Sequence, residues 1–313
     1  MKPADMSTKH NLDVRLGRRL PPAAGVPSVT AAARWVLLLL LALRPFPALA
    51  GDTAGSTPEI DRALVRMYNF DFPKAQKILD EHIAGNPDDP LGYSMLAAVH
   101  LFSELDRLMI LEGEFFTDDR RIREKNTLKA DPAVRERLHQ AVGEAQSRAR
   151  SILAQRPDDR NALFSLCMAT GVLTDYAGFV EKRKLASLSY AKQSHNHALE
   201  LLRHHPSFAD AYLTTGLTEY LLGSLPFFVR WFVRFDQAEG SKSQAVKNLE
   251  LVAREGRYLG PFARILLAII HFREKRPREA QKLLEVLARD YPENHLIRKE
   301  LAKLSKAAAE VSQ

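Results

Sequence analysis

The sequence predicts an all-α protein, a right-handed solenoid of about five helical hairpins with a C-terminal capping helix. One observation is a recurring spacing, in which a small residue is followed twelve positions later by proline and a polar turn. The copies pair Ala75 with Pro87, Ala145 with Pro157, Ser194 with Pro206, and Ala280 with Pro292. The second is composition, because 46% of the 313 residues are hydrophobic while 15 glycines and 17 prolines are too few for a turn-dense β protein.

The spacing has a physical reason in paired antiparallel helices. Two helices approach closely only where a crossing side chain is as small as alanine, which is the expected role of Ala75, Ala145 and Ala280. Proline lacks a backbone donor and disfavours helical geometry in the residue before it, so each proline marks the end of a helix. The acidic residues that follow Pro87 and Pro157 suit the first turn of the next helix.

The predicted hairpins follow from apolar residues at helical spacing. The first hairpin covers 58–68 and the helix around Ala75, and the second begins at Pro90 and returns over 131–155, interrupted by an insertion at 111–130. The remaining predicted helices are 160–174 with 181–204, 208–222 with 238–254, 261–273 with 277–290, and a last helix over 293–310. The weakly apolar character of the last helix suits the terminal cap of a solenoid.

These hairpins resemble the tetratricopeptide-repeat family, whose unit is a helical hairpin of about 34 residues. The matching residues are Tyr93, Leu96 and Ala97 in one unit, Leu163, Leu166 and Cys167 in the next, and Leu267, Ala268, Ala280, Leu284, Leu287 and Pro292 in the last. The match covers nearly all of 57–292. The chain departs from the family in repeat length, because successive prolines of the pattern lie 70, 49 and 86 residues apart.

The resemblance implies that the first helix of each hairpin lines a concave face. The residues placed on or near that face are Met95, Phe102, Phe164, Met168, Leu213, Leu217 and Tyr220. They would offer an apolar and aromatic groove to a partner. The alternative, that they are simply core residues, stays open because apolar helix positions are mostly packing positions.

The segment 224–235 is unusually aromatic. Its candidate partner-binding residues are Phe227, Phe228, Arg230, Trp231, Phe232 and Arg234. A helix of this kind docks on a partner, lies at a membrane interface, or covers the core of its own protein. Together with Gly223-Ser224-Leu225-Pro226 and Glu239-Gly240, the segment also resembles, more loosely, helical-repeat proteins of the mitochondrial outer membrane and of inclusion-body clearance.

The N-terminal residues have the features of a secretory signal peptide. Basic residues precede the apolar run 35–43, and Ala48-Leu49-Ala50 follows it, which predicts cleavage after Ala50 and a mature domain over 51–313. The nine-residue run is shorter than the ~20 residues of a membrane-spanning helix, so a retained anchor is the alternative. We therefore expect an exported protein, periplasmic or secreted.

Charge gives no support to nucleic-acid binding. Residues 1–50 hold seven basic and two acidic side chains, which account for five units of the net charge of +7 and leave +2 for the mature part. A nucleic-acid interface needs a concentrated basic stripe. The expected partners are a protein or peptide, or an apolar ligand, with peripheral membrane contact as a further alternative.

Motifs for catalysis or cofactor binding are not recognisable. Acidic residues from Glu104 to Asp119 could hold a cation, but no calcium-loop spacing is present and nearby arginines predict ion pairs instead. The single Cys167 lies among apolar residues as a small core residue would. The sequence contains no phosphate-binding glycine loop, nucleophile elbow or paired cysteine motif, so we expect no catalytic residue, metal or cofactor.

The sequence therefore predicts an exported binding or assembly scaffold that is not an enzyme. The alternative is a carrier of an apolar small molecule or lipid, and an enzyme with an unidentified site comes third. An open groove would suit a peptide partner, whereas a small apolar ligand needs a pocket enclosed by apolar atoms.

Overall fold

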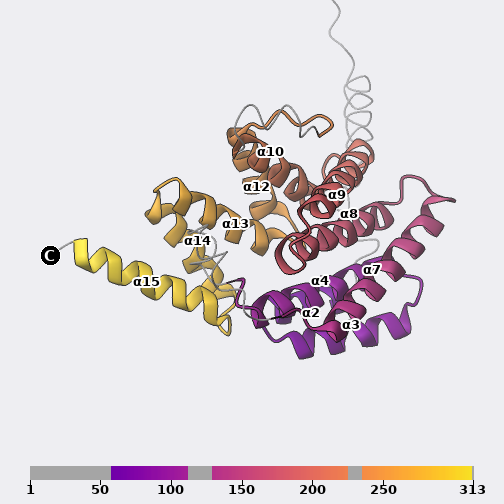
Figure 1. Ribbon diagram of the computed structural model, residues 1–313, viewed down its shortest axis with the longest axis horizontal. Coiled ribbons are helices and arrows are strands. Elements are labelled where there is room, and N and C mark those ends of the chain that lie inside the picture. The colour runs from indigo at the N-terminus through magenta and orange to yellow at the C-terminus, as the bar shows by residue number, and fades with distance from the viewer. Residues whose placement is uncertain (1–57, 112–128, 225–234, 312–313) are drawn as a thin grey trace, which may run out of the picture. The chain divides into compact units, whose positions relative to one another are not determined.

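The computed structural model describes residues 58–111, 129–224 and 235–311, all of which belong to the unit Gly55–Gln313. Within these ranges the protein is built from eleven α-helices and contains no β-strand, which confirms the predicted all-α class (Figure 1). The α-helices are α2 Pro58–Tyr68, α3 Phe72–Gly85, α4 Pro90–Arg107, α7 Pro132–Leu153, α8 Arg160–Asp175, α9 Lys184–His204, α10 Tyr212–Ser224, α12 Lys242–Glu255, α13 Gly260–Arg273, α14 Pro277–Asp290 and α15 His295–Val311.

The polar turns after the prolines cap the following helices. Asp89 and Asp159 accept hydrogen bonds from the backbone N–H groups of Leu91 and Ala162, which satisfies donors at the starts of α4 and α8. Asp131 caps α7 in the same way. The short motif that the sequence repeats is therefore a helix stop followed by an N-cap.

Consecutive helices pack as pairs: α2 with α3, α4 with α7, α8 with α9, α10 with α12, and α13 with α14. The small residues of the sequence pattern lie where neighbouring helices meet, because Ala75, Ala145 and Ala280 are 0% exposed and Ser194 is 3% exposed. Larger side chains at these positions would force the paired helices apart.

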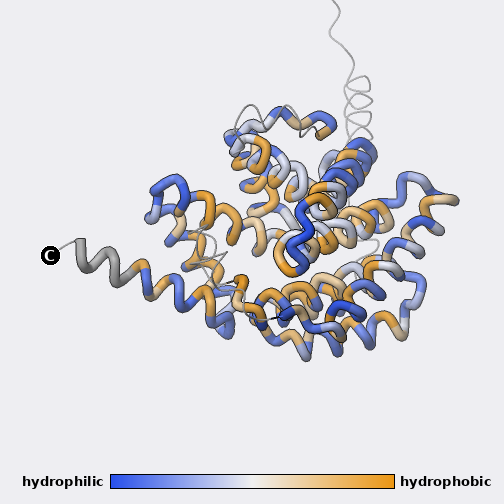
Figure 2. The backbone as a smooth tube through the Cα atoms, in the orientation of Figure 1, coloured by the Kyte–Doolittle hydropathy of each residue, from blue (hydrophilic) through white to orange (hydrophobic). Residues whose placement is uncertain are grey.

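Hydrophobic and hydrophilic residues alternate along the outer helices, as Figure 2 shows for α14 and the first part of α15. The buried residues of α14 are Ala280, Leu284 and Leu287, at the spacing expected for one helix face. Together with Ala268 of α13 and Ile297 of α15 they form a small core of their own. The last helix thus covers the end of the hairpin array with an amphipathic face.

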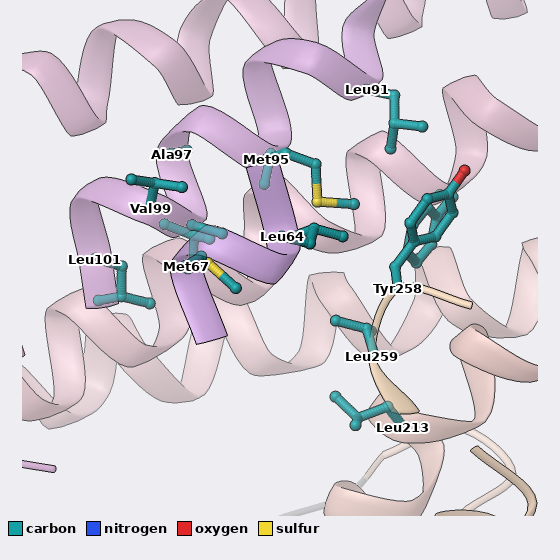
Figure 3. Close-up of a cluster of buried hydrophobic side chains, with 14 of the residues drawn as sticks. Leu64, Met67, Leu91, Met95, Ala97, Val99, Leu101, Leu213, Tyr258 and Leu259 are labelled. Atoms are coloured by element: carbon teal, nitrogen blue, oxygen red, sulfur yellow. The ribbon is translucent and has the colours of Figure 1, made fainter. Parts of the chain in front are cut away.

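The largest core joins residues that are far apart in the sequence. Figure 3 shows Leu64 and Met67 of α2 and Met95 of α4 in one cluster with Leu213, Tyr258 and Leu259 from the second half of the chain. Met95 is fully buried there.

Three polar interactions join the first hairpin to residues 190 or more positions later in the chain; we call them the closing contact. The Tyr68 hydroxyl donates to the Tyr258 carbonyl at 2.9 Å, and the Asn294 side-chain amide donates to the Tyr68 carbonyl at 2.8 Å. The Asn69 side-chain oxygen accepts from the Glu293 backbone N–H at 3.0 Å. The first hairpin therefore touches both the α12–α13 and the α14–α15 connections.

Three predicted helix starts were wrong. Helix α10 was expected from 208 but begins at Tyr212, after a 3-10 turn over Ala209–Ala211. The third hairpin was expected to turn at Asp175 and return from 181, but the chain instead continues as a π-helical turn, Tyr176–Val180, in which the Glu181 N–H donates to the Tyr176 carbonyl at 3.0 Å. The return helix α9 then begins at Lys184. The return helix of the fourth hairpin begins at Lys242 rather than 238, after Gly240 adopts a positive φ of 78° and Ser241 caps the helix.

One stretch within the described residues, Arg160–Val180, is long and apolar enough by length and composition to cross a membrane. A buried core helix meets the same criterion, and 61% of its most apolar window is buried inside the protein.

Asp210 holds the backbone segment that contributes Tyr258 to the closing contact. Its buried carboxylate accepts backbone N–H groups of Arg257, Tyr258 and Leu259 at 3.0, 3.0 and 2.8 Å. Burial raises its pKa, although these three donors lower it. The carboxylate thereby holds the segment whose Tyr258 carbonyl receives Tyr68.

We expect Asp210→Ala to lower the free energy of unfolding by about 3 kcal/mol or more, because it leaves buried N–H groups without acceptors. Urea unfolding followed by circular dichroism measures the loss. The matched control is Asp61→Ala, which removes an ion pair to Arg257 between two side chains that are about 40% exposed and should cost about 0–1 kcal/mol. Equal losses in the two variants would contradict the proposed role of Asp210.

Candidate functional site

The candidate site is an apolar pocket of about 360 Å³. Its walls come from helices throughout the chain, and we refer to it below as the apolar pocket. The residues that line it include Phe70, Leu101, Phe102, Leu105, Gly171, Thr174, Asp175, Phe179, Ser194, Thr214, Leu217, Thr218, Leu221, Phe235, Phe262, Ile265, Leu266, Ile269, Phe272, Asn294, Ile297 and Glu300.

Four of the walls are faces of the helices that begin the hairpins. Lining residues recur at three- and four-residue spacing: 101 and 105 on α4, 171, 174 and 175 on α8, 214, 217, 218 and 221 on α10, and 262, 265, 266 and 269 on α13. The first helix of each of these four hairpins therefore contributes one face to the wall of the pocket. Phe102 and Phe262 meet edge to face in its wall, with ring centroids 5.5 Å apart.

Three of the four hydroxyl groups in the wall already donate to the backbone. The Thr174, Thr218 and Ser194 hydroxyls donate to the carbonyls of Thr170, Thr214 and Cys167, each at 3.0 Å. Their protons are used within the protein, while lone pairs remain on the oxygen atoms. The fourth hydroxyl, that of Thr214, lies 3.3 Å from the Cys167 Sγ atom, and either of these two atoms can be the donor.

Asp175 is the unusual residue of the pocket. It keeps some accessible surface where it lines the pocket, yet it lies in a densely packed part of the protein. Within the described part of the chain, its carboxyl group has no ion pair and no side-chain hydrogen bond. Burial raises the pKa of Asp175 to about 7, and no charged neighbour among residues 58–111, 129–224 and 235–311 contributes to this shift.

Other carboxylates close to the pocket are compensated, unlike Asp175. Glu300 lies 2.9 Å from the Lys303 ammonium group. The buried Glu219 accepts the backbone N–H groups of Glu239 and Ser241 at 3.1 and 2.6 Å. An uncompensated carboxyl group in an apolar wall is costly to keep, so Asp175 is the residue whose presence packing does not explain.

The chain immediately after Asp175 is also irregular. The π-helical turn Tyr176–Val180 follows it directly, and single π-helical turns occur frequently at functional sites. The Ser187 hydroxyl donates to the Thr174 carbonyl at 2.9 Å, which bridges the wall helix to α9 across the turn. The backbone on either side of Asp175 is thus held by both helices of the third hairpin.

The predicted groove residues divide between pocket and core. Phe102 and Leu217 line the apolar pocket. Met95, Phe164 and Leu213 are 0%, 1% and 7% exposed and belong to the main core. For these three residues the alternative expectation, a core role rather than a groove role, is confirmed. Met168 and Tyr220 are partly buried and pack against that core. The six candidates from Phe227 to Arg234 lie outside the described residues.

The acidic residues before the insertion form a structural clamp. Glu104 is 0% exposed and accepts two hydrogen bonds from the Arg107 guanidinium, at 2.8 and 2.7 Å, and one from the Asp131 N–H at 2.8 Å. This arrangement ties α4 to the start of α7 through Arg107 and a backbone donor. The basic residues of the insertion that were expected to pair with these carboxylates lie outside the described residues. In the described ranges no three His, Cys, Asp or Glu side chains are grouped as metal ligands.

Asp175 was not predicted as a site residue because it was expected to lie in a turn. A usable signal was present, since Asp175 is the only charged residue between Arg160 and Glu181. The contributions of α13 and α15 were not predicted either, because their lining residues look like ordinary core positions in the sequence.

Comparison with known protein families, with curated proteins and with solved structures finds no match.

We expect the stability effect of Asp175→Asn to depend on pH. The folded state holds this proton more tightly than an unfolded chain with a pKa near 3.8, so the wild type loses stability as pH rises from about 4 through about 7. The variant should be more stable than wild type by about 2–4 kcal/mol at pH 8, since one pKa unit corresponds to about 1.4 kcal/mol. Near pH 4 the two should be similar.

Urea unfolding of both proteins at pH 4 and pH 8 measures this difference. Glu300→Gln is the control, because its carboxylate is already paired with Lys303. A difference between Asp175→Asn and wild type that stays the same at both pH values would contradict the prediction.

Proposed function

We propose that the protein is a carrier that holds an apolar small molecule in the apolar pocket. The observation that supports this most is the pocket itself, whose walls are drawn from α4, α8, α10, α13 and α15. Its volume of about 360 Å³ lies within the range of roughly 300–1,000 Å³ that is typical of small-molecule sites.

The scaffold we propose is a right-handed solenoid of tetratricopeptide-repeat type. The pairing of successive helices and the burial of the small residues at their crossings support it. The closing contact favours a carrier over an open peptide groove, because it brings the last connections of the array against the first hairpin. Walls on several sides of one space suit a compact ligand.

A protein or peptide partner is the second candidate function. Phe179 and Leu221 line the pocket and are 38% and 59% exposed, so apolar side chains also reach the surface beside it. Patches of this kind serve as interaction sites when they are large enough. We also propose that the chain is exported, on the strength of the apolar run 35–43 and the Ala48-Leu49-Ala50 signature.

Filling the pocket tests the carrier function. Gly171 lines the pocket, and a Cβ atom added there would meet only the Ser194 hydroxyl oxygen, at 3.6 Å. We expect Gly171→Leu to weaken binding of the neutral dye Nile red at least tenfold, because the larger side chain occupies the ligand's space. Gly171→Ala should retain binding and be slightly more stable, by about 0.5–1 kcal/mol, since alanine favours a helix interior.

Dye fluorescence titrations on the full chain measure this, with native mass spectrometry to detect a co-purified small molecule. Leu185→Asn is a surface control, because Leu185 is 85% exposed and is not among the residues that line the pocket. Unchanged dye affinity in Gly171→Leu would argue against the pocket as the site. Loss of dye binding in Leu185→Asn, with dye binding retained in Gly171→Leu, would point to a surface site and favour the protein-partner function.

A further inference from the structure

We infer that the apolar pocket is selective for apolar amines, whose ammonium group pairs with the Asp175 carboxylate while the hydrocarbon body fills the space between the hairpins. This inference rests on the proposed carrier function and adds the chemical class of the ligand.

The charge of the pocket wall is the first support. The only ionisable side chains among the described residues that line it are Asp175 and Glu300, and no lysine, arginine or histidine lines it. The Glu300 carboxylate is already 2.9 Å from the Lys303 ammonium group. The wall therefore has one negative group whose opposite charge the described protein does not supply.

The hydrogen-bonding character of the wall points the same way. The hydroxyls of Thr174, Thr218 and Ser194 donate to backbone carbonyls, so their oxygen atoms can serve a ligand only as hydrogen-bond acceptors. The Thr214 hydroxyl is 3.3 Å from the Cys167 Sγ atom. A primary ammonium group carries three donors and no acceptor. An alcohol supplies only one donor, and a carboxylate ligand supplies none.

The cost of burial decides between the ligand classes. A neutral apolar ligand would leave the Asp175 carboxyl group without a partner in apolar surroundings, and an anionic ligand would add repulsion. An ammonium group instead compensates the carboxylate and forms charge-assisted hydrogen bonds, which are about twice as strong as neutral ones. Burial raises the pKa of Asp175 to about 7, because the charged form is poorly solvated in this wall.

The backbone around Asp175 is held in place by contacts between two helices. It ends α8 at the point where the chain enters the π-helical turn, and the Ser187 hydroxyl bonds the carbonyl of the preceding Thr174 at 2.9 Å. The backbone around the carboxyl group is thus held from two helices, α8 and α9. Phe179, on the same turn, lines the pocket as well and gives the ligand an aromatic neighbour.

The test compares three ligands of equal chain length, 1-octylamine, 1-octanol and octanoate, titrated calorimetrically into the full chain at pH 8. We expect the amine to bind about tenfold or more tightly than the alcohol, and octanoate to bind most weakly. In Asp175→Asn the preference for the amine should fall below about twofold, while octanol affinity stays the same.

Asp61→Asn is the matched control, because it removes a carboxylate that pairs with Arg257 at the surface and is not among the residues that line the pocket, so it should keep the amine preference. Equal binding of amine and alcohol to the wild type would overturn the inference, as would an amine preference that survives in Asp175→Asn. If octanol binds and Gly171→Leu blocks it, but the amine has no advantage, the carrier function stands and only the ligand class is wrong. If none of the three ligands binds, the carrier function fails as well.

Discussion

The closing contact is the interaction on which the pocket depends. The Tyr68 hydroxyl and carbonyl both bond to residues near the other end of the described chain, at separations of 190 and 226 positions. Buried hydrogen bonds are costly to leave unmade, so this contact defines where the first hairpin and the last connections meet. Asp210 accepts the Tyr258 backbone N–H and so holds the residue whose carbonyl accepts the Tyr68 hydroxyl. The walls from α4 and α13 then stand close enough for Phe102 and Phe262 to touch.

The carboxyl groups inside the described part of this protein are of two kinds, those that accept several hydrogen bonds and one that accepts none. The second kind lies in the candidate site. Glu104, Asp210 and Glu219 are buried carboxylates that each receive several hydrogen bonds from arginine or backbone donors, and each one joins segments distant in the sequence. Asp175 forms no such bond within the described residues. Burial raises the pKa of this carboxyl group to about 7, and perturbed carboxyl groups of this kind occur preferentially at functional sites.

Much of the local structure was predictable because it depends on neighbours in the sequence. Helix α2 spans 58–68 as expected, and the proline-aspartate turns became N-caps because an Asp side chain reaches the N–H groups two or three residues ahead. The π-helical turn after Asp175 was not predictable in this way, since it depends on how α8 and α9 pack together. The groove prediction was partly useful, because Phe102 and Leu217 line the pocket, whereas Met95 and Phe164 are core.

By itself, the sequence determined the all-α class, several helix boundaries and the pairing of consecutive helices, because helical periodicity, small residues and prolines act over a few residues. Only the tertiary structure decided which apolar stripes became core and which became pocket wall. Both kinds have the same spacing and composition, so they differ only in what faces them across the fold. The same holds for Asp175: its charge stands out in an apolar stretch, but its lack of a partner among the described residues emerges only when the helices around it are in place.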